Sequence, residues 1–428
     1  MVFRRALIPL GLVLLVGGLA VAGLSVPERP SDGPSAALPA IDPGAGPAGQ
    51  NLARLQQAAR ADPEDWRAWA ALGSAYVEEA RATGASSWYP SAEAAFDRSL
   101  ALNPARNADA SAGMGALAAA RHDFALALEW GEKARDIAPD DPLVYGAVGD
   151  ALVELGRYPE AFGAFQRMVD LRPGLASYAR VSYARELQGD VAGAIVAMEA
   201  AADAASDKRG KAFATFQLGE LYWNSGRAEE AVRHYERANA LDPGFVPPRA
   251  RLARARFYEG RVEEAVDRYE EVLQRLPLPE YVIDLADIYR VSRQPALAEE
   301  QVALLEAQRR LLASDGVATD LEFALFSADH GIDLEAGLAA ARAQWERRKS
   351  VFVADVLAWQ LYAHGRHEEA LAMSDQALRL GTRNALFHFH RSMIEGALGR
   401  TEAARADLEQ AMTINPRFSI LHTAGDSK

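Results

Sequence analysis

Residues 212–243, AFATFQLGELYWNSGRAEEAVRHYERANALDP, contain one complete copy of a unit that recurs along most of the chain. Small and apolar residues repeat at helical period in each half of the stretch, so each half has one apolar stripe. Asn224, Ser225 and Gly226 interrupt the pattern, and glycine readily adopts the left-handed conformation that ends a helix. The stretch therefore predicts two short helices joined by a tight turn, neither of which can bury its stripe alone.

Small residues are expected where the two helices cross. Gly219 and Ala231 remove side-chain bulk there, and Tyr222 and Tyr235 are predicted to fill the space on either side. The arrangement resembles the tetratricopeptide repeat, a unit of about 34 residues. Thr215 stands where that family has its first aromatic residue. The positions that match the family pattern are Leu218, Gly219, Tyr222, Ala231, Tyr235, Ala238 and Pro243.

Further copies follow when the same pattern is moved along the sequence. Together they make about ten units. The resemblance implies an all-α fold, a right-handed α-solenoid of stacked helix-turn-helix repeats behind an N-terminal hydrophobic segment. In such a stack each repeat touches only its neighbours, so we expect one elongated domain with an open groove. The other copies cover residues 66–104, 108–141, 142–175, 175–208, 246–279, 279–312, 319–350, 351–384 and 385–418.

The N-terminus predicts export. Residues 6–24 carry no charge and follow Arg4 and Arg5, a pattern that favours a cytoplasmic N-terminus. The stretch is long enough to span a bilayer, whereas Ala-Val-Ala at 20–22 fits signal-peptidase cleavage. Residues 1–24 are thus a signal peptide or a membrane anchor, with membrane contact through 6–24 if they are retained. The protein is expected outside the cytoplasm, in the cell envelope or secreted.

The remaining boundaries follow from composition. Residues 25–50 are rich in proline and glycine and predict a linker, followed by the solenoid over 51–418 and a tail over 419–428. The tail has no amphipathic capping helix. The flank of the last repeat is therefore either exposed and open to self-association, or covered by Phe418, Ile420 and Leu421 folding back.

Charge and composition exclude several classes of function. The formal net charge of −13 argues against a nucleic-acid scaffold, which needs a basic footprint. The absence of cysteine excludes disulfides and thiolate metal sites. No nucleophile elbow, phosphate loop or zinc-protease motif is present, so we predict a protein that is not an enzyme and has no cofactor. A metal-handling accessory protein remains an alternative, through the C-terminal His364, His367, His388 and His390.

The concave face of such a stack is lined by first-helix positions. The resemblance implies a scaffold or peptide receptor, and we hypothesise that a partner's peptide or helix binds near Trp223, Arg254 and Phe257, with the arginine reading a carboxylate. The alternative is that Trp223, Phe257 and Trp359 pack between neighbouring repeats. The candidate partner-binding residues are Tyr183, Glu220, Trp223, Asn224, Arg254, Phe257, Arg290, Trp359, Tyr362 and Phe389.

The last two repeats carry a second, narrower resemblance. Residues 357–371, LAWQLYAHGRHEEAL, and the segments that follow are similar to the C-terminal end of a group of exported bacterial tetratricopeptide-repeat proteins without an assigned activity. This likeness implies a fold and a location. The partner is left open, as a protein or peptide.

Overall fold

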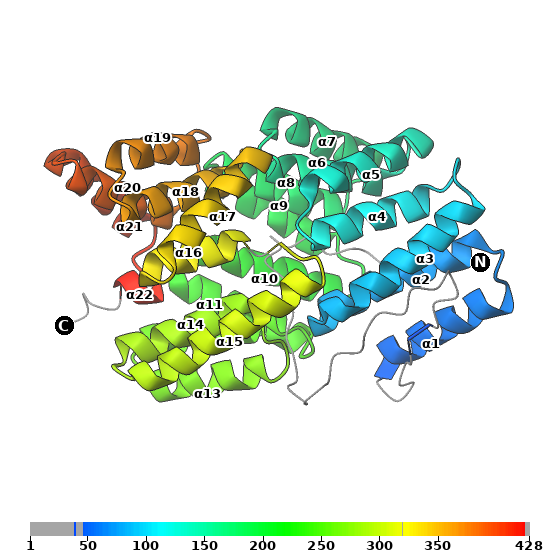
Figure 1. Ribbon diagram of the computed structural model, residues 1–428, viewed down its shortest axis with the longest axis horizontal. Coiled ribbons are helices and arrows are strands. Elements are labelled where there is room, and N and C mark those ends of the chain that lie inside the picture. The colour runs from blue at the N-terminus through cyan, green and yellow to red at the C-terminus, as the bar shows by residue number, and fades with distance from the viewer. Residues whose placement is uncertain (1–37, 40–45, 319, 424–428) are drawn as a thin grey trace.

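The computed structural model describes residues 38–39, 46–318 and 320–423, and all regular secondary structure in them is helical (Figure 1). The prediction of an all-α repeat fold is confirmed. The predicted signal or anchor segment and most of the predicted linker lie outside the described residues. Helix α1 (Gly46–Ala61) begins inside the predicted linker, because Leu52 and Ala59 pack against the next helix. None of the described helices is both long and apolar enough to span a bilayer.

Each predicted copy corresponds to one pair of helices, and the pairs stack in chain order. A 3₁₀ turn at Ser86–Trp88 lengthens the connection inside the first pair. The pairs are α2 (Trp66–Thr83) with α3 (Tyr89–Leu102), α4 (Ala108–Ala120) with α5 (Phe124–Ile137), α6 (Pro142–Glu154) with α7 (Tyr158–Leu171), α8 (Leu175–Leu187) with α9 (Val191–Asp203), α10 (Lys208–Asn224) with α11 (Ala228–Leu241), α12 (Pro247–Tyr258) with α13 (Val262–Leu273), α14 (Pro279–Val291) with α15 (Pro295–Ser314), α16 (Asp320–His330) with α17 (Leu334–Arg347), α18 (Val351–Ala363) with α19 (His367–Leu378), and α20 (Ala385–Ala397) with α21 (Thr401–Ile414). A final short helix, α22 (Ile420–Thr423), follows.

The crossing within a pair is closer than the sequence predicted. The ring of Tyr235 lies directly over Gly219, where an added Cβ would be 2.4 Å from a ring carbon. The same pairing recurs between Gly149 and Phe165, at 2.3 Å. The aromatic ring of the second helix therefore occupies the space above the glycine and does not flank it, because glycine leaves room for a whole ring.

The stack curves back on itself, so units far apart in the sequence touch. Beyond α15, Ala318 N donates to Arg121 O at the turn after α4, over 3.2 Å. Beyond α17, Lys349 N donates to Leu155 O at the end of α6, over 3.1 Å. Each contact joins a unit to the unit five positions further along the stack. Figure 1 shows α17 and α18 beside α6 and α8. The expectation that each repeat touches only its neighbours is wrong.

Glycines in the turns allow the units that are five positions apart to come into close contact. Gly156, with φ of 78°, lies so near residue 349 that an added Cβ would be 2.2 Å from Lys349 O. At Gly189 the corresponding distance to Gly381 O is 2.3 Å. Backbone therefore packs on backbone at both turns, which is the physical reason that the curved stack can close.

Candidate functional site

The curved stack surrounds a partly open cavity of about 430 Å³, which we call the inner chamber. Most of its wall is the inner face of the first helices α4, α6, α8, α10 and α12, with further residues from α2, α5 and α9. Phe352 of α18 and the loop residues Thr382 and Arg383 close it from the later units. An open groove was expected from the sequence, and the chamber exists because the second half of the stack covers the first.

Buried ion pairs line much of this chamber. Arg180 is nearly buried and holds Asp150 with an Nη2–Oδ2 distance of 2.8 Å. Arg251 reaches Glu220 at 3.0 Å and comes within 3.8 Å of Glu280. Burial raises the pKa of Glu280 to about 7, although Arg251 opposes the shift. Removing either partner of such a pair would leave a charge poorly solvated.

Two further polar side chains of α8 face the chamber without a cation beside them. The Glu186 carboxylate has one hydrogen-bond partner, Asn224 Nδ2, at 3.4 Å. The Tyr183 hydroxyl is buried and has no hydrogen-bond partner. Burial and the nearby Glu154 carboxylate raise the pKa of Tyr183 well above its usual value. Both residues are thus able to bond a group that enters the chamber.

One end of the concave face holds the chain's own C-terminal segment, defined as residues 417–423. Arg254 Nη2 donates to the Phe418 carbonyl over 2.9 Å, and the Phe418 ring packs on Phe389 at 5.2 Å between centroids. The hydroxyls of Tyr258 and Thr423 lie 3.3 Å apart. The segment therefore bridges the α12 unit and the α20 unit.

The rest of the segment is anchored in both an apolar and a polar site. Ile420 is 1% exposed and joins the hydrophobic cluster of α12–α14. His422 Nε2 lies 3.1 Å from Asp329 Oδ1, which also accepts the Trp359 indole N–H over 2.8 Å. Burial alone would raise the pKa of Asp329, but the His422 bond and the nearby His390 hold it below its usual value. The tail folds back as one alternative expected, but Ile420 packs on the α12–α14 units and not on the last repeat. Met393, Leu408 and Met412 of the last repeat stay 37–43% exposed, so its flank is covered only in part.

The predicted partner-binding residues fall into two groups, with two residues outside them. Tyr183, Glu220, Trp223 and Asn224 line the inner chamber, and Arg254 lies between the chamber and the C-terminal segment. Trp359, Tyr362 and Phe389 form an aromatic group beside that segment.

Arg290 is exposed and lies outside both groups, and Phe257 is buried against Tyr258. Trp223 and Trp359 are also buried, so packing between repeats accounts for these large aromatics. Partner contact by the candidate residues stays a prediction.

Sequence reasoning missed Asp150, Arg180 and Arg251 as lining residues. The signal was present, because all three are charged residues on first helices, where apolar residues dominate. Their pairing could not be inferred without the curvature of the stack.

The C-terminal histidines are separately engaged. His390 is fully buried, with Nδ1 3.0 Å from Asp355, and stacks on Trp359. His364 Nδ1 lies 2.8 Å from its own helix's carbonyl at residue 360. In the part of the chain that the structure describes, no group of three or more histidine and carboxylate side chains is arranged to hold a metal ion. The metal-handling alternative therefore has no geometric support there.

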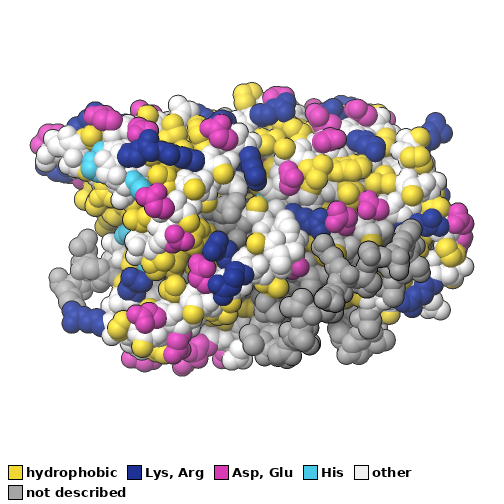
Figure 2. Space-filling view, in the orientation of Figure 1, with side chains coloured by type: hydrophobic (Ala, Val, Ile, Leu, Met, Phe, Trp, Pro, Cys, Tyr) yellow, Lys and Arg dark blue, Asp and Glu magenta, His cyan; other side chains and the backbone are white. Residues whose placement is uncertain are grey.

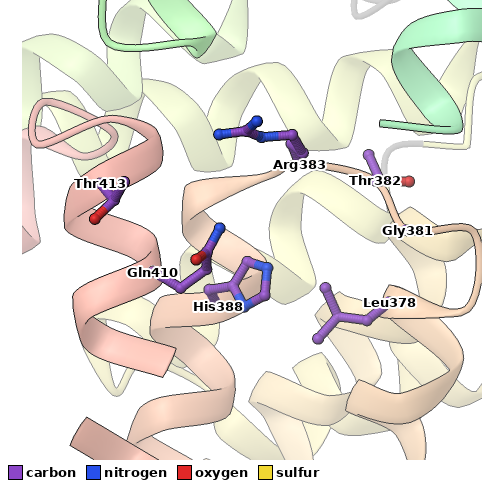
Figure 3. Close-up of a pocket in the computed structure, with 7 residues that line it drawn as sticks. All are labelled: Leu378, Gly381, Thr382, Arg383, His388, Gln410 and Thr413. Carbon is purple, nitrogen blue, oxygen red and sulfur yellow. The ribbon is translucent and has the colours of Figure 1, made fainter. Parts of the chain in front are cut away.

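A second pocket, of about 510 Å³, lies at the surface between α20, α21 and the loop before α20 (Figure 3). His388 of α20 and Gln410 of α21 face the same space in this view. The His388 imidazole is engaged, with Nδ1 2.6 Å from Asp407. Across the face in Figure 2, acidic and basic side chains are interspersed and do not gather into a basic patch.

Comparison with known proteins identifies the repeat. Two tetratricopeptide-repeat models match the chain, one at residues 222–288 and the other at 77–142 and 356–417. Among solved structures, the chain is similar to PilW, a type IV pilus biogenesis factor, at 17% identity over 47% of this chain and 92% of that one, with a TM-score of 0.39. It is also similar to a thermophilic tetratricopeptide-repeat protein of Thermus thermophilus, at 22% identity over 40% and 92%, with a TM-score of 0.36. For PilF of Pseudomonas aeruginosa the identity is 15% over 49% and 90%, with a TM-score of 0.36. No curated protein matches the chain.

Proposed function

The chain contains tetratricopeptide repeats, and from this premise we propose that it is a non-enzymatic interaction scaffold whose concave groove binds an extended segment of a partner protein. The repeats indicate protein–protein interaction. The proposal includes an envelope location, exported or held in the cytoplasmic membrane by residues 6–24, because an uncharged stretch follows Arg4 and Arg5.

The C-terminal segment is the observation that carries the proposal, because it occupies the groove as a bound peptide would. Arg254 of the groove donates a hydrogen bond to a backbone carbonyl of the segment. The Ile420 side chain of the segment enters an apolar site. Recognition of a peptide by main-chain bonds plus side-chain pockets is a recurring mode. A partner segment that competes for the groove would then carry an aliphatic residue two positions after an aromatic one.

Arg254 was expected to bind a partner's carboxylate, but in the structure it binds the chain's own Phe418 carbonyl. Arg254 Nη1 already lies 4.0 Å from Asp284, while Nη2 donates to the Phe418 carbonyl. Its charge is therefore largely compensated inside the protein. The groove favours a partner that offers a carbonyl and apolar side chains over one that offers a carboxylate.

A peptide added in trans tests this function. Ile420→Asp in the full chain should release the C-terminal segment, because a carboxylate cannot stay in an apolar cluster. A fluorescently labelled peptide of residues 414–428 should then bind the variant at least about tenfold more tightly than the wild type, as expected from burying one isoleucine side chain. Fluorescence anisotropy measures both affinities.

Two controls make the outcome specific. Val196→Asp introduces the same charge at a position that is 63% exposed, and should leave peptide binding at the wild-type level. The peptide carrying Ile420→Asp should not bind the opened groove. Equal binding of the labelled peptide to wild type and Ile420→Asp, with both folded by circular dichroism, would refute a groove that selects such a segment.

The location is tested separately, by fractionating the native cell. The protein should be recovered with the envelope or outside the cell, and deletion of residues 1–24 should retain it in the cytosol. Recovery of the intact wild type in the cytosol would contradict the proposed export.

A further inference from the structure

We propose that the inner chamber is a binding site for an organic cation, an ammonium or guanidinium group on an apolar body, with Glu186 as its counter-charge. Phe418 of the C-terminal segment is part of the chamber wall, so the ligand is expected to bind the full chain with that segment in place.

The pairing of the lining carboxylates points to a cation. The lining carboxylates other than Glu186 each have a cationic partner. Asp150 pairs with Arg180 at 2.8 Å, and Glu220 pairs with Arg251 at 3.0 Å. Glu154 lies 2.9 Å from Arg348 Nη1. Glu186 has only the neutral amide of Asn224, so it is the lining carboxylate whose charge is uncompensated.

Tyr183, on the same helix as Glu186, supplies a second, independent observation. Its hydroxyl oxygen lines the chamber, is shielded from solvent, and makes no hydrogen bond within the protein. Buried polar groups without a partner are rare, because each one loses its bond to water. An ammonium or guanidinium N–H donor would satisfy this oxygen and the Glu186 carboxylate.

The walls explain why the ligand should be organic. Trp223, Phe124 and Phe352 line the chamber together with aliphatic side chains. A volume of about 430 Å³ lies within the range of small-molecule sites, far larger than a bare ion fills. Aromatic faces also attract a cation through the ring quadrupole. The chamber therefore offers contact to both the charge and the body of such a ligand.

Most of the lining arginines are already engaged, although Arg254 Nε has no hydrogen-bond partner. Arg180 and Arg251 hold the carboxylates named above, and Arg254 bonds the Phe418 carbonyl. Arg81 lies 3.5 Å from Glu78. Arg383 is exposed and is the remaining arginine of the lining. When it is ionised, Glu186 is thus the lining carboxylate without a cationic partner, and the exposed Arg383 is the lining cation that remains open to an anion.

The site should depend on pH through Glu186. Burial raises the pKa of Glu186 to about 7; the Asn224 hydrogen bond opposes the shift, and Glu220 on α10 adds to it. From α6, Asp150 and Glu154 face the same space, both paired with arginines. The ionised fraction of such a carboxyl rises from about one-tenth at pH 6 to about nine-tenths at pH 8. Cation affinity should therefore rise about tenfold over this interval.

The same raised pKa predicts how the Glu186→Gln variant folds. A carboxyl whose folded-state pKa lies above its unfolded value stabilises the fold fully only below the unfolded value, and this contribution is lost as pH rises to about 7. At pH 8 the wild-type protein bears the cost of a buried, ionised carboxylate, which the neutral amide of the variant avoids. The variant should therefore melt at or above the wild-type temperature, which keeps it usable as a binding control.

Isothermal titration of the full chain with 2-phenylethylamine at pH 8 tests the proposal. Binding should weaken at least about tenfold in Glu186→Gln, since a charge-assisted hydrogen bond is lost. Tyr183→Phe should weaken it by a smaller factor. Glu346→Gln, which changes a side chain 82% exposed outside the chamber, should match the wild type.

Two isosteric probes decide between ligand classes. Neutral 2-phenylethanol and anionic phenylacetate should bind more weakly than the amine at pH 8, and the difference should shrink at pH 6. Equal binding of the alcohol, tighter binding of phenylacetate, unchanged affinity in Glu186→Gln, or no heat with the amine would each overturn the cation site. The peptide experiment with Ile420→Asp does not involve Glu186, so either proposal can fail while the other stands.

Discussion

Gly156→Ala should destabilise the protein much more than Gly365→Ala, although both glycines end a first helix and precede an arginine. Both have positive φ, 78° and 70°, so alanine at either position costs about 1 to 2 kcal/mol of backbone strain. Only at Gly156 would the new Cβ meet backbone, 2.2 Å from Lys349 O, whereas nothing lies within 4 Å at Gly365. The new Cβ would force the turn at Gly156 away from the backbone at Lys349, which should cost about 1 to 3 kcal/mol more.

Urea unfolding followed by circular dichroism measures this difference. Gly399→Ala is a second control, because Gly399 also has positive φ and no atom within 4 Å of an added Cβ. The three variants should have similar unfolding slopes, with Gly156→Ala giving the lowest midpoint. Equal midpoints for Gly156→Ala and Gly365→Ala would mean that Gly156 and the backbone at Lys349 are not in contact in solution.

These two glycines also show what the sequence could and could not predict. Leu155-Gly156-Arg157 and His364-Gly365-Arg366 carry the same local signal, a helix end and a turn, and both turns form as predicted. Helix pairs are predictable because their stripes and turns are local in sequence. Which turn is covered by a unit five positions later depends on the summed curvature of all the intervening units, which no single repeat encodes.

The candidate site was predicted in part for the same reason. Trp223 and Arg254 were placed on the concave face because they occupy first-helix positions, and both do lie near the enclosed space. Trp223 is nevertheless buried, because aromatic residues at such positions also fill the gap between stacked units. The apolar tail residues made a folded-back segment one of two alternatives, but the arginine that binds Phe418 lies more than a hundred residues earlier in the chain, beyond any local pattern.

The close crossing within one unit gives the other large effect, through Gly219 and Tyr235. Tyr235→Ala should cost about 3 to 5 kcal/mol, since it empties a fully buried site. Gly219→Ala places a Cβ 2.4 Å from the Tyr235 ring. It should cost about 1 to 3 kcal/mol from overpacking, even though alanine is the better helix former. Denaturant unfolding of both variants gives the two free energies.

The double variant determines whether the ring itself causes the cost at Gly219. Once Tyr235 is alanine, the added Cβ has room, and the gain of about 1 kcal/mol from helix propensity should appear as stabilisation. Gly163→Ala on α7, with no atom within 4 Å of an added Cβ, should show the same gain in the wild-type background. The two effects should therefore be non-additive by more than about 1 kcal/mol. Additive free energies would mean that Tyr235 does not lie over Gly219, and the pairing of a glycine with an aromatic ring seen at Gly219 and Gly149 would need another explanation.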